Sequence, residues 1–461
     1  MTIRIDYTNM MAGAVAGGLA AEAWSGAADD FARARGVLVE RRGRGELGFI
    51  DLALEGKGIE ELLKFADGTG QAFSDVVVLG IGGSALGPIA LRSALRSTSW
   101  NALDDQAREY YPRLHVLENV DPVTVAGVLG RVELGRTLFL VISKSGGTAE
   151  TMAQYLIARG RLQAELGEDF QRHLVFITDP EKGALREVAR RDGIVALEIP
   201  SNVGGRFSVL SAVGLLPAAL IGIDVRALLA GAAEMFSRCD SGDFANNPAA
   251  VFGTLQWMAD TRFGLRNHVI MPYSDSLRDF GGWFVQLWAE SLGKVKPDGT
   301  SVGPTPIPAL GVTDQHSQVQ LFMEGPRDKT VTFVTVGKGA ADLEIPKLHD
   351  DIPELAYLGG HTLAELLDAE RQATAAALSQ RGRLNMTITL DSIDAHHVGG
   401  LIMLFEMATI YAGGLYGINP LDQPGVELGK RYTYALMGRP DAADARREWD
   451  AIPEPERRFS V

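Results

Sequence analysis

Short, uninterrupted runs of hydrophobic residues recur between residues 75 and 200. Segments of helix-forming composition separate most of these runs. Continuous apolar strands that alternate with helices are typical of a parallel sheet covered on both faces. The pattern therefore predicts a doubly wound α/β domain. Its predicted strands are rich in β-branched residues and lie at 75–79, 114–117, 137–142, 174–178 and 194–199.

A second and less regular set of hydrophobic runs follows, at 268–271, 330–336 and 386–390. Helical segments separate these runs as well, which predicts a second α/β domain. The expected helices lie near 278–294, 313–325 and 362–379. Because no low-complexity linker divides the two sets, we expect the two sheets to share an interface. Ligand sites then fall at the carboxyl ends of the strands and at the domain boundary.

The segments at the two ends of the chain have a helical composition. The N-terminal part is Ala-rich, and the part beyond residue 397 consists of helix-forming stretches joined by Gly- and Pro-containing loops. We therefore expect an α/β protein of two doubly wound, mainly parallel sheets with an N-terminal helical arm and C-terminal helices. The expected boundaries are 1–65 for the arm, 66–215 for the first domain, 216–435 for the second and 436–461 for a C-terminal tail.

Charge and composition argue against several classes of partner. The 461 residues include 44 Lys and Arg against 58 Asp and Glu, and the formal net charge of −14 disfavours nucleic acid and anionic membranes. No apolar run approaches the ~18 residues of a membrane span, and no signal-peptide pattern is evident, so a cytoplasmic enzyme is expected. Cys239 is the single cysteine, which excludes an intrachain disulfide and a Cys-based metal site.

The first predicted strand runs directly into a glycine-rich loop, Gly80–Gly87. Glycines after a strand let the backbone turn tightly and bring its N–H groups close to a ligand, and Ser84 is placed to cap the following helix. A Gly-x-Gly-x-x-Ala spacing from Gly80 also matches a dinucleotide fingerprint. However, Glu118 lies 38 residues after Gly80, farther than the ~20 residues typical of the ribose-binding acid. The loop is therefore a candidate ligand site of either kind, or a simple turn.

A second loop, Ser143–Thr151, joins the third predicted strand to a helix and combines hydroxyls, one lysine and two glycines. Such a set offers O–H donors, exposed N–H groups and a helix N-terminus, which together suit a single phosphate. The Gly-Lys-Ser/Thr order of a Walker loop is absent. The alternative is an N-capped helix after a Ser/Gly turn, and we favour the monophosphate site.

One carboxylate, Glu290, lies in the run 285–294, whose Gln, Trp, Leu and Ala residues predict a mostly buried helix. A buried carboxylate is costly in free energy unless it is paired or used in chemistry, which makes Glu290 a candidate general base. A salt-bridged structural carboxylate is the alternative. Taken alone, this residue does not decide between the two interpretations.

Two longer motifs, together with these loops and helix, resemble the glucose-6-phosphate isomerase family. The segment Gly204–Gly214 is similar to the family's first signature, and Gly417–Lys430 is similar to its second. The resemblance covers residues 60 to 440, approximately, and implies two sugar-isomerase (SIS) domains. The chain departs from many relatives at Ala289, at Leu292 and in the Gly146-Gly147 pair, which concerns loop packing rather than any acid–base group.

The resemblance implies roles for four residues in an aldose–ketose exchange that uses no metal or other cofactor. Glu290 aligns with the base that moves a proton between C2 and C1, and Arg206 aligns with the arginine that stabilises the cis-enediolate. His316 aligns with a histidine that assists ring opening and is contributed by the neighbouring subunit, which implies a homodimer. Lys430 aligns with the lysine beside the ring oxygen.

Further residues resemble the family's substrate contacts. Three of them resemble positions around the sugar, namely Gly83, Ser84 and Gln286. Four resemble the phosphate cradle, namely Ser143, Lys144, Ser145 and Thr148. The phosphate takes no part in the chemistry, and its binding energy holds the sugar in register.

The resemblance thus implies reversible isomerisation of D-glucose 6-phosphate and D-fructose 6-phosphate, in glycolysis and gluconeogenesis. A dehydrogenase that uses NAD would leave the second loop, Glu290 and Lys430 without a role. A non-catalytic SIS regulator would be expected to lack Glu290, Arg206 or His316, and all three are present. An aminosugar-phosphate isomerase or deaminase of the SIS type would usually be shorter or fused to another domain. A side activity on mannose 6-phosphate stays open.

Overall fold

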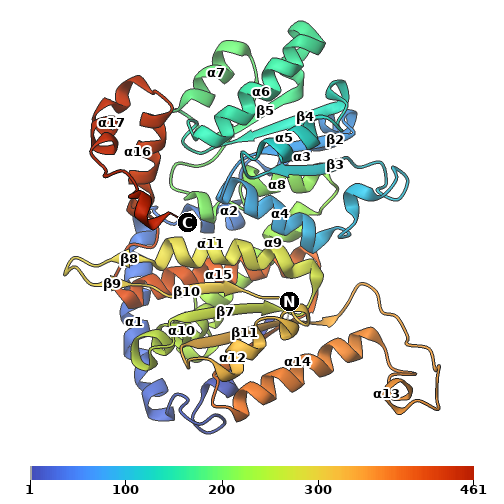
Figure 1. The fold of residues 1–461 in the computed structure, drawn as a ribbon, viewed down its shortest axis with the longest axis vertical. Helices are drawn as coiled ribbons and strands as arrows, with labels where there is room; N and C mark the ends of the chain where they lie inside the picture. Colours follow the sequence, from blue (N-terminus) through green and yellow to red (C-terminus); the bar gives the residue numbers. More distant parts are fainter. Residues whose placement is uncertain (1–2, 461) are drawn as a thin grey trace. The chain divides into compact units, whose positions relative to one another are not determined.

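A computed structural model of the chain describes residues 3–460. It divides into two units, Met1–Pro420 (unit 1) and Leu421–Val461 (unit 2). Unit 1 contains two five-stranded sheets, each with helices packed against it (Figure 1). The predicted α/β class with mainly parallel sheets is confirmed.

The first sheet has the order β3-β2-β4-β5-β6, and all of its strands are parallel. Every residue of its central strands is buried, because helices cover both faces of the sheet. The strands are β2 (Asp75–Leu79), β3 (Arg113–Leu117), β4 (Thr137–Ile142), β5 (Leu174–Thr178) and β6 (Val195–Glu198). The helices between them are α4 (Gly83–Leu95), α5 (Pro122–Leu129), α6 (Ala149–Leu166) and α7 (Ala184–Asp192).

The second sheet has the order β1-β12-β11-β7-β10 and is parallel except for β1, which pairs antiparallel with β12. Its strands are β1 (Ile3–Asp6), β7 (Asn267–Pro272), β10 (Thr305–Pro308), β11 (Lys329–Lys338) and β12 (Asn385–Ser392). The hydrophobic pattern did not predict β1 or β10. Both are four-residue edge strands, and β10 carries two prolines, which cannot donate to a neighbouring strand and are found mainly in edge strands.

The remaining helices of unit 1 surround and connect the two sheets. They are α1 (Ala21–Gly43), α2 (Gly48–Glu55), α3 (Ile59–Asp67), α8 (Ala212–Leu220), α9 (Val225–Cys239), α10 (Pro248–Phe263), α11 (Arg278–Leu292), α12 (Val319–Glu324), α13 (Pro353–Ala356), α14 (Leu363–Gln380) and α15 (Ala395–Tyr416). A small hairpin, β8 (Lys294–Val295) and β9 (Ser301–Val302), follows α11. In Figure 1, α11 and α15 run side by side between the two sheets, so α11 lies where ligands of such folds bind.

The helix expected near 313–325 is interrupted. A short 3-10 turn, Thr313–His316, ends at Ser317, whose backbone is not helical, and α12 begins at Val319. The carboxylate of Asp314 stabilises this turn, because it accepts hydrogen bonds from the Leu310 amide at 2.7 Å and from the Ser317 hydroxyl. The turn leaves His316 exposed at its end.

Helix α15 is long and apolar enough to cross a membrane by length and composition, but 89% of its most apolar window is buried inside the protein. Glycines allow this burial. A Cβ atom at Gly399 would lie 1.9 Å from the Leu228 carbonyl oxygen, and one at Gly231 would lie 1.8 Å from the His396 carbonyl oxygen. This close contact with α9 is the packing of a helix in a protein core.

The carboxyl group of Glu406, in α15, is fully buried, and neither of its oxygens has a hydrogen-bond partner among residues 3–460. Burial raises the pKa of this carboxyl well above its ordinary value of 4.5. The folded state therefore keeps the proton that the unfolded state loses, so this group makes the free energy of unfolding fall as pH rises above that value.

We expect Glu406→Gln to remove this pH dependence, because an amide does not ionise. Between about pH 5 and about pH 8, the free energy of unfolding of the variant should rise relative to that of the wild type by up to about 1.4 kcal/mol per pH unit. Urea unfolding at both pH values measures this change, with the exposed Glu22→Gln as a control. An equal stability difference at both pH values would contradict the burial of a protonated carboxyl.

Unit 2 consists of α16 (Glu427–Leu436) and α17 (Ala443–Asp450) with short 3-10 turns. The two helices pack through the rings of Tyr432 and Trp449, whose centroids lie 5.6 Å apart. An ion pair of 2.8 Å between Arg431 and Glu448 joins them on the surface. The segment after residue 436 therefore contains a helix in addition to extended chain.

Candidate active site

The glycine-rich loop after β2 packs directly against the turn that carries Arg206. A Cβ atom at Gly83, the first residue of α4, would lie 2.1 Å from the carbonyl oxygen of Gly205. Only glycine allows this approach of two backbones. Helix α4 begins at Gly83, so Gly82 is its N-cap residue and has a φ of +57°. Ser84 lies within the first turn of the helix. The expectation that Ser84 caps the helix is wrong, because the loop turns two residues earlier.

Helix α11 presents Gln286 and Glu290 to this loop. The two side chains are one helical turn apart, and the Gln286 amide donates a hydrogen bond of 3.1 Å to the Glu290 carboxylate. The same amide nitrogen lies 2.9 Å from where a Cβ atom at Gly82 would be. The Gln286 Oε1 atom is buried and has no hydrogen-bond partner among residues 3–460. The side chain of Glu290 is 26% exposed and is thus accessible to a ligand.

Arg206 contributes a buried positive charge next to this carboxylate. Its side chain is 3% exposed, and its Nη1 lies 3.6 Å from Glu290 Oε1. Its Nε donates to the Ser291 hydroxyl at 2.7 Å, and its Nη2 donates to the Pro420 carbonyl at 2.6 Å. The guanidinium is therefore fixed in position before any ligand binds.

The loop after β4 forms a cluster of three hydroxyls, which we call the hydroxyl cluster: Ser143, Ser145 and Thr148. The Ser143 and Thr148 oxygens are 2.8 Å apart, and Ser145 Oγ is 3.4 Å from each. Thr148 is the N-cap residue of α6, so the cluster lies at the positive end of a helix dipole. Gly146 has a φ of +64° and packs on Gly183, which explains the glycine at this position. This arrangement suits an anion such as a phosphate group.

Lys144 links the hydroxyl cluster to the Arg206 turn. Its ammonium donates to the carbonyls of Ser201 at 2.8 Å and Val203 at 2.7 Å, just before the glycines that precede Arg206. Burial lowers the pKa of the Lys144 ammonium, and the nearby carboxylate of Asp179 opposes this effect. Lys144 therefore holds two parts of the site together.

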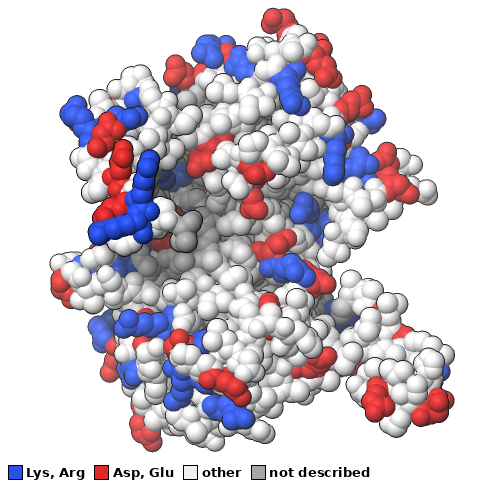
Figure 2. Space-filling model, viewed as in Figure 1, with Lys and Arg blue, Asp and Glu red and all other residues white. Residues whose placement is uncertain are grey.

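An anionic ligand needs local positive charge at this site, because the chain as a whole is acidic. On the face drawn in Figure 2, Lys and Arg are interspersed with Asp and Glu over the surface. The positive groups of the site are buried or partly buried instead, namely Arg206, Lys144 and the N-terminus of α6. A buried charge is less screened by water and salt than a surface charge, so these groups suit an anionic ligand.

The structure therefore brings several predicted site residues into contact. Gly83, Gln286, Glu290 and Arg206 form one contiguous group, and Lys144 joins the hydroxyl cluster to the Arg206 turn. His316 is exposed, and its ring has no hydrogen-bond or ion-pair partner among residues 3–460. Lys430 belongs to unit 2, where its ammonium pairs with Glu427 at 2.8 Å.

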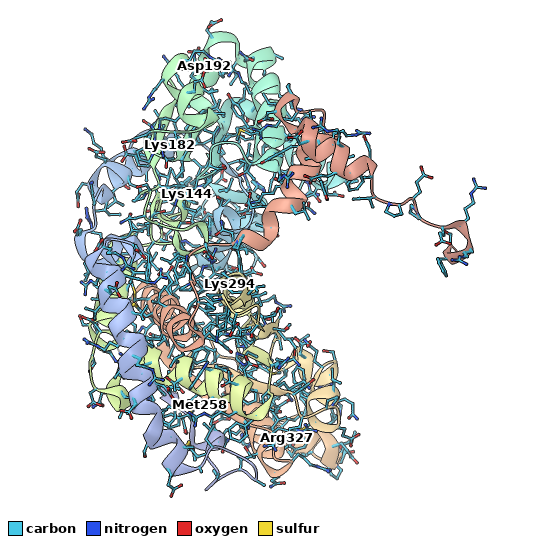
Figure 3. All side chains as sticks on the ribbon, turned by 90° about the vertical axis from the view of Figure 1, so that its left-hand side faces the viewer. Lys144, Lys182, Asp192, Met258, Lys294 and Arg327 are labelled. Carbon is cyan, nitrogen blue, oxygen red and sulfur yellow. The ribbon has the colours of Figure 1, made fainter. Side chains whose placement is uncertain are left out.

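Two residues of this site had no predicted role. Ser291 contacts Arg206. Lys294, which is labelled in Figure 3, donates to the Glu290 backbone carbonyl at 2.6 Å and satisfies an acceptor at the end of α11. The signal in the sequence was weak: one hydroxyl and one cation near Glu290 in an apolar helix. Among residues 3–460, no group of three His, Cys, Asp or Glu side chains is arranged to hold a metal ion.

Two mainly parallel sheets flanked by helices, an accessible carboxylate beside a buried guanidinium, and an adjoining hydroxyl cluster fit the class of sugar-phosphate isomerases. A family model described as phosphoglucose isomerase matches residues 63–453. The chain belongs to this family, whose known reaction is the interconversion of glucose 6-phosphate and fructose 6-phosphate.

The similarity to individual relatives extends over nearly the whole chain. The glucose-6-phosphate isomerase of Rubrobacter xylanophilus is 46% identical over 440 residues, which cover 95% of this chain and 98% of the relative. That of Carboxydothermus hydrogenoformans is 43% identical over 453 residues, or 97% of each chain. The solved structure of a hypothetical protein from Thermus thermophilus is 38% identical, with a TM-score of 0.85 over 95% of this chain and 100% of that one. The chain therefore shares both its sequence and its fold with these relatives.

Proposed function

We propose that the protein interconverts D-glucose 6-phosphate and D-fructose 6-phosphate through a cis-enediolate, with Glu290 as the base. The reaction serves glycolysis and gluconeogenesis in the cytoplasm. One observation carries the proposal: the accessible Glu290 side chain has a carboxylate oxygen 3.6 Å from a buried guanidinium nitrogen. The reaction removes a proton next to a carbonyl and returns it to the adjacent carbon. One carboxylate can perform both transfers, because the two carbons are bonded to each other.

The roles of the neighbouring groups follow from where charge develops. Negative charge forms on the oxygens of the enediolate, and the fixed, always protonated Arg206 is placed to stabilise it. Gln286 holds the Glu290 carboxylate in place through its amide N–H group and lies beside the sugar. The hydroxyl cluster and α6 bind the phosphate, and Gly83 and Ser84 begin the helix that faces the sugar. Binding energy at the phosphate keeps the reacting carbons in register.

The assay that tests this function couples fructose 6-phosphate to glucose-6-phosphate dehydrogenase and NADP, with EDTA present. We expect NADPH to form only when both the chain and the coupling enzyme are added. NADPH formed from glucose 6-phosphate without the coupling enzyme would favour a dehydrogenase. A chain that is inert in the coupled assay would contradict the isomerase proposal and favour a sugar-phosphate-sensing regulator.

We further propose that His316 assists ring opening in the site of a second subunit of a homodimer, together with Lys430. The exposed imidazole has no partner within residues 3–460 of its own chain, which supports a role outside it. Imidazole exchanges protons near neutral pH, as ring opening requires.

Mixing two inactive variants tests whether His316 acts across subunits. A hybrid dimer of Glu290→Gln and His316→Ala chains has one site with both changes and one site with neither. Random mixing should therefore restore up to about one quarter of the wild-type activity, since half of the dimers are hybrids with one intact site. Each variant alone is the control. If mixing under exchange conditions restores no activity, His316 does not act across subunits.

Removing a hydroxyl of the cluster should weaken phosphate binding. We expect Ser143→Ala and Thr148→Val each to lower kcat/KM by about 10- to 100-fold, because a hydrogen bond to a charged group is lost. Inorganic phosphate should inhibit each variant correspondingly more weakly. Ser237→Ala, at an exposed hydroxyl of α9, is the control. An unchanged inhibition constant for phosphate would place the anion elsewhere.

A further inference from the structure

The bond between Ser291 and Arg206 is made in the fully desolvated part of the site. Counted over the whole residue, Ser291 is 0% exposed and Arg206 is 4% exposed. The Nε atom of an arginine carries one hydrogen, and here that hydrogen is donated to Ser291 Oγ at 2.7 Å. A buried N–H that loses its acceptor is costly, so the guanidinium has a strong preference for the orientation that keeps this bond.

Two acceptors hold the same edge of the planar guanidinium. Nε donates to Ser291 and Nη2 donates to the Pro420 carbonyl at 2.6 Å. Two bonds along one edge fix both the plane and the rotation of the group. In this orientation the third nitrogen, Nη1, lies 3.6 Å from Glu290 Oε1.

Ser291 is also the next residue after Glu290 in α11. The proposed base and the acceptor that orients the guanidinium therefore belong to the same helical turn. The position of the base relative to Arg206 is set by this turn, although 85 residues separate Arg206 from Ser291 in the sequence.

We propose that Ser291 is a positioning residue for the isomerisation: its hydroxyl holds Arg206 in the orientation in which the guanidinium faces Glu290 and the enediolate oxygens. The inference rests on the proposed function of Glu290 and Arg206. Ser291 acts through Arg206 and not on the sugar, so its effect falls on the intermediate, where charge has developed, more than on the bound sugar phosphate.

The test compares Ser291→Ala with Ser291→Thr and with a matched control. Ser291→Ala should lower kcat by about 10- to 100-fold, as expected for a lost hydrogen bond to a charged group, while KM changes by less than about threefold. Ser291→Thr keeps the hydroxyl and should recover most of the lost kcat. The control is Ser379→Ala, which also removes a partly buried helical hydroxyl that accepts a side-chain bond, here from Asn385 at 3.0 Å. It should retain wild-type kcat.

Inhibitor binding separates positioning from a general structural effect. The first probe is a planar hydroxamate analogue of the enediolate that carries a phosphate, and the second is inorganic phosphate. Ser291→Ala should weaken the hydroxamate by about the same factor as kcat, with phosphate inhibition unchanged. If both probes weaken equally, or if Ser291→Ala retains kcat as the control does, the inference is wrong. An inert wild-type chain would instead overturn the proposed function itself.

Discussion

Glu290→Gln should lower kcat by about 10²- to 10⁴-fold, the range typical of a positioned proton transfer. The amide has nearly the same shape as the carboxylate but cannot accept the sugar proton. It can still contact Gln286, so the packing of α11 should be unchanged. The coupled assay measures kcat, and wash-out of deuterium from glucose 6-phosphate labelled at C2 reports proton removal directly. Both readings should fall together.

Two further measurements make this result specific to the base. Inhibition by inorganic phosphate should match the wild type, because the hydroxyl cluster is untouched. Glu61→Gln, at an exposed carboxylate of α3, should retain full activity. If Glu290→Gln isomerises the sugar at the wild-type rate, the reaction stands but another group removes the proton.

The strands that the sequence predicted best are those whose residues are all buried. The bounds of β2, β4 and β5 agree with the hydrophobic runs, because a strand covered on both faces consists mostly of apolar residues. The edge strands β1 and β10 were missed for the converse reason. They are short and partly exposed, and β1 pairs with a strand more than 370 residues away. Such pairing leaves no local signal.

The site shows the same division between local and long-range information. Loops that follow strands and a carboxylate in an apolar helix can be read from consecutive residues, and these gave Gly83, Glu290 and the hydroxyl cluster. Two hydrogen-bond acceptors of Lys144 lie 57 and 59 residues away in the sequence, and two acceptors of Arg206 lie 85 and 214 residues away. Three of these four acceptors are backbone carbonyls, which every residue carries, so no residue type marks them in the sequence. The positions of the Lys144 and Arg206 charges in the site therefore could not be predicted from the sequence and are seen only in the folded structure.

Arg206→Lys should lower kcat by about 10²- to 10³-fold, even though it keeps a positive charge. An ammonium cannot donate simultaneously to Ser291, Pro420 and a developing oxyanion in the planar geometry of a guanidinium. The two buried acceptors would lose their donors, so thermal stability should fall as well. Steady-state kinetics and thermal unfolding measure the two effects separately.

The matched control is Arg226→Lys, at an exposed arginine that makes two bonds of 2.6 and 2.9 Å to Glu60. Its stability should change by less than about 1 kcal/mol, since exposed ion pairs contribute little, and its kcat should be unchanged. Binding of the hydroxamate analogue decides the role of Arg206. A loss that parallels kcat assigns the guanidinium to the intermediate, whereas a rise in KM at constant kcat would assign it to the bound sugar phosphate and contradict the role proposed here. We expect the loss of hydroxamate binding to parallel the loss of kcat. Arg206 is buried and fixed beside Glu290, so its charge stabilises the enediolate that forms there more than the bound sugar phosphate.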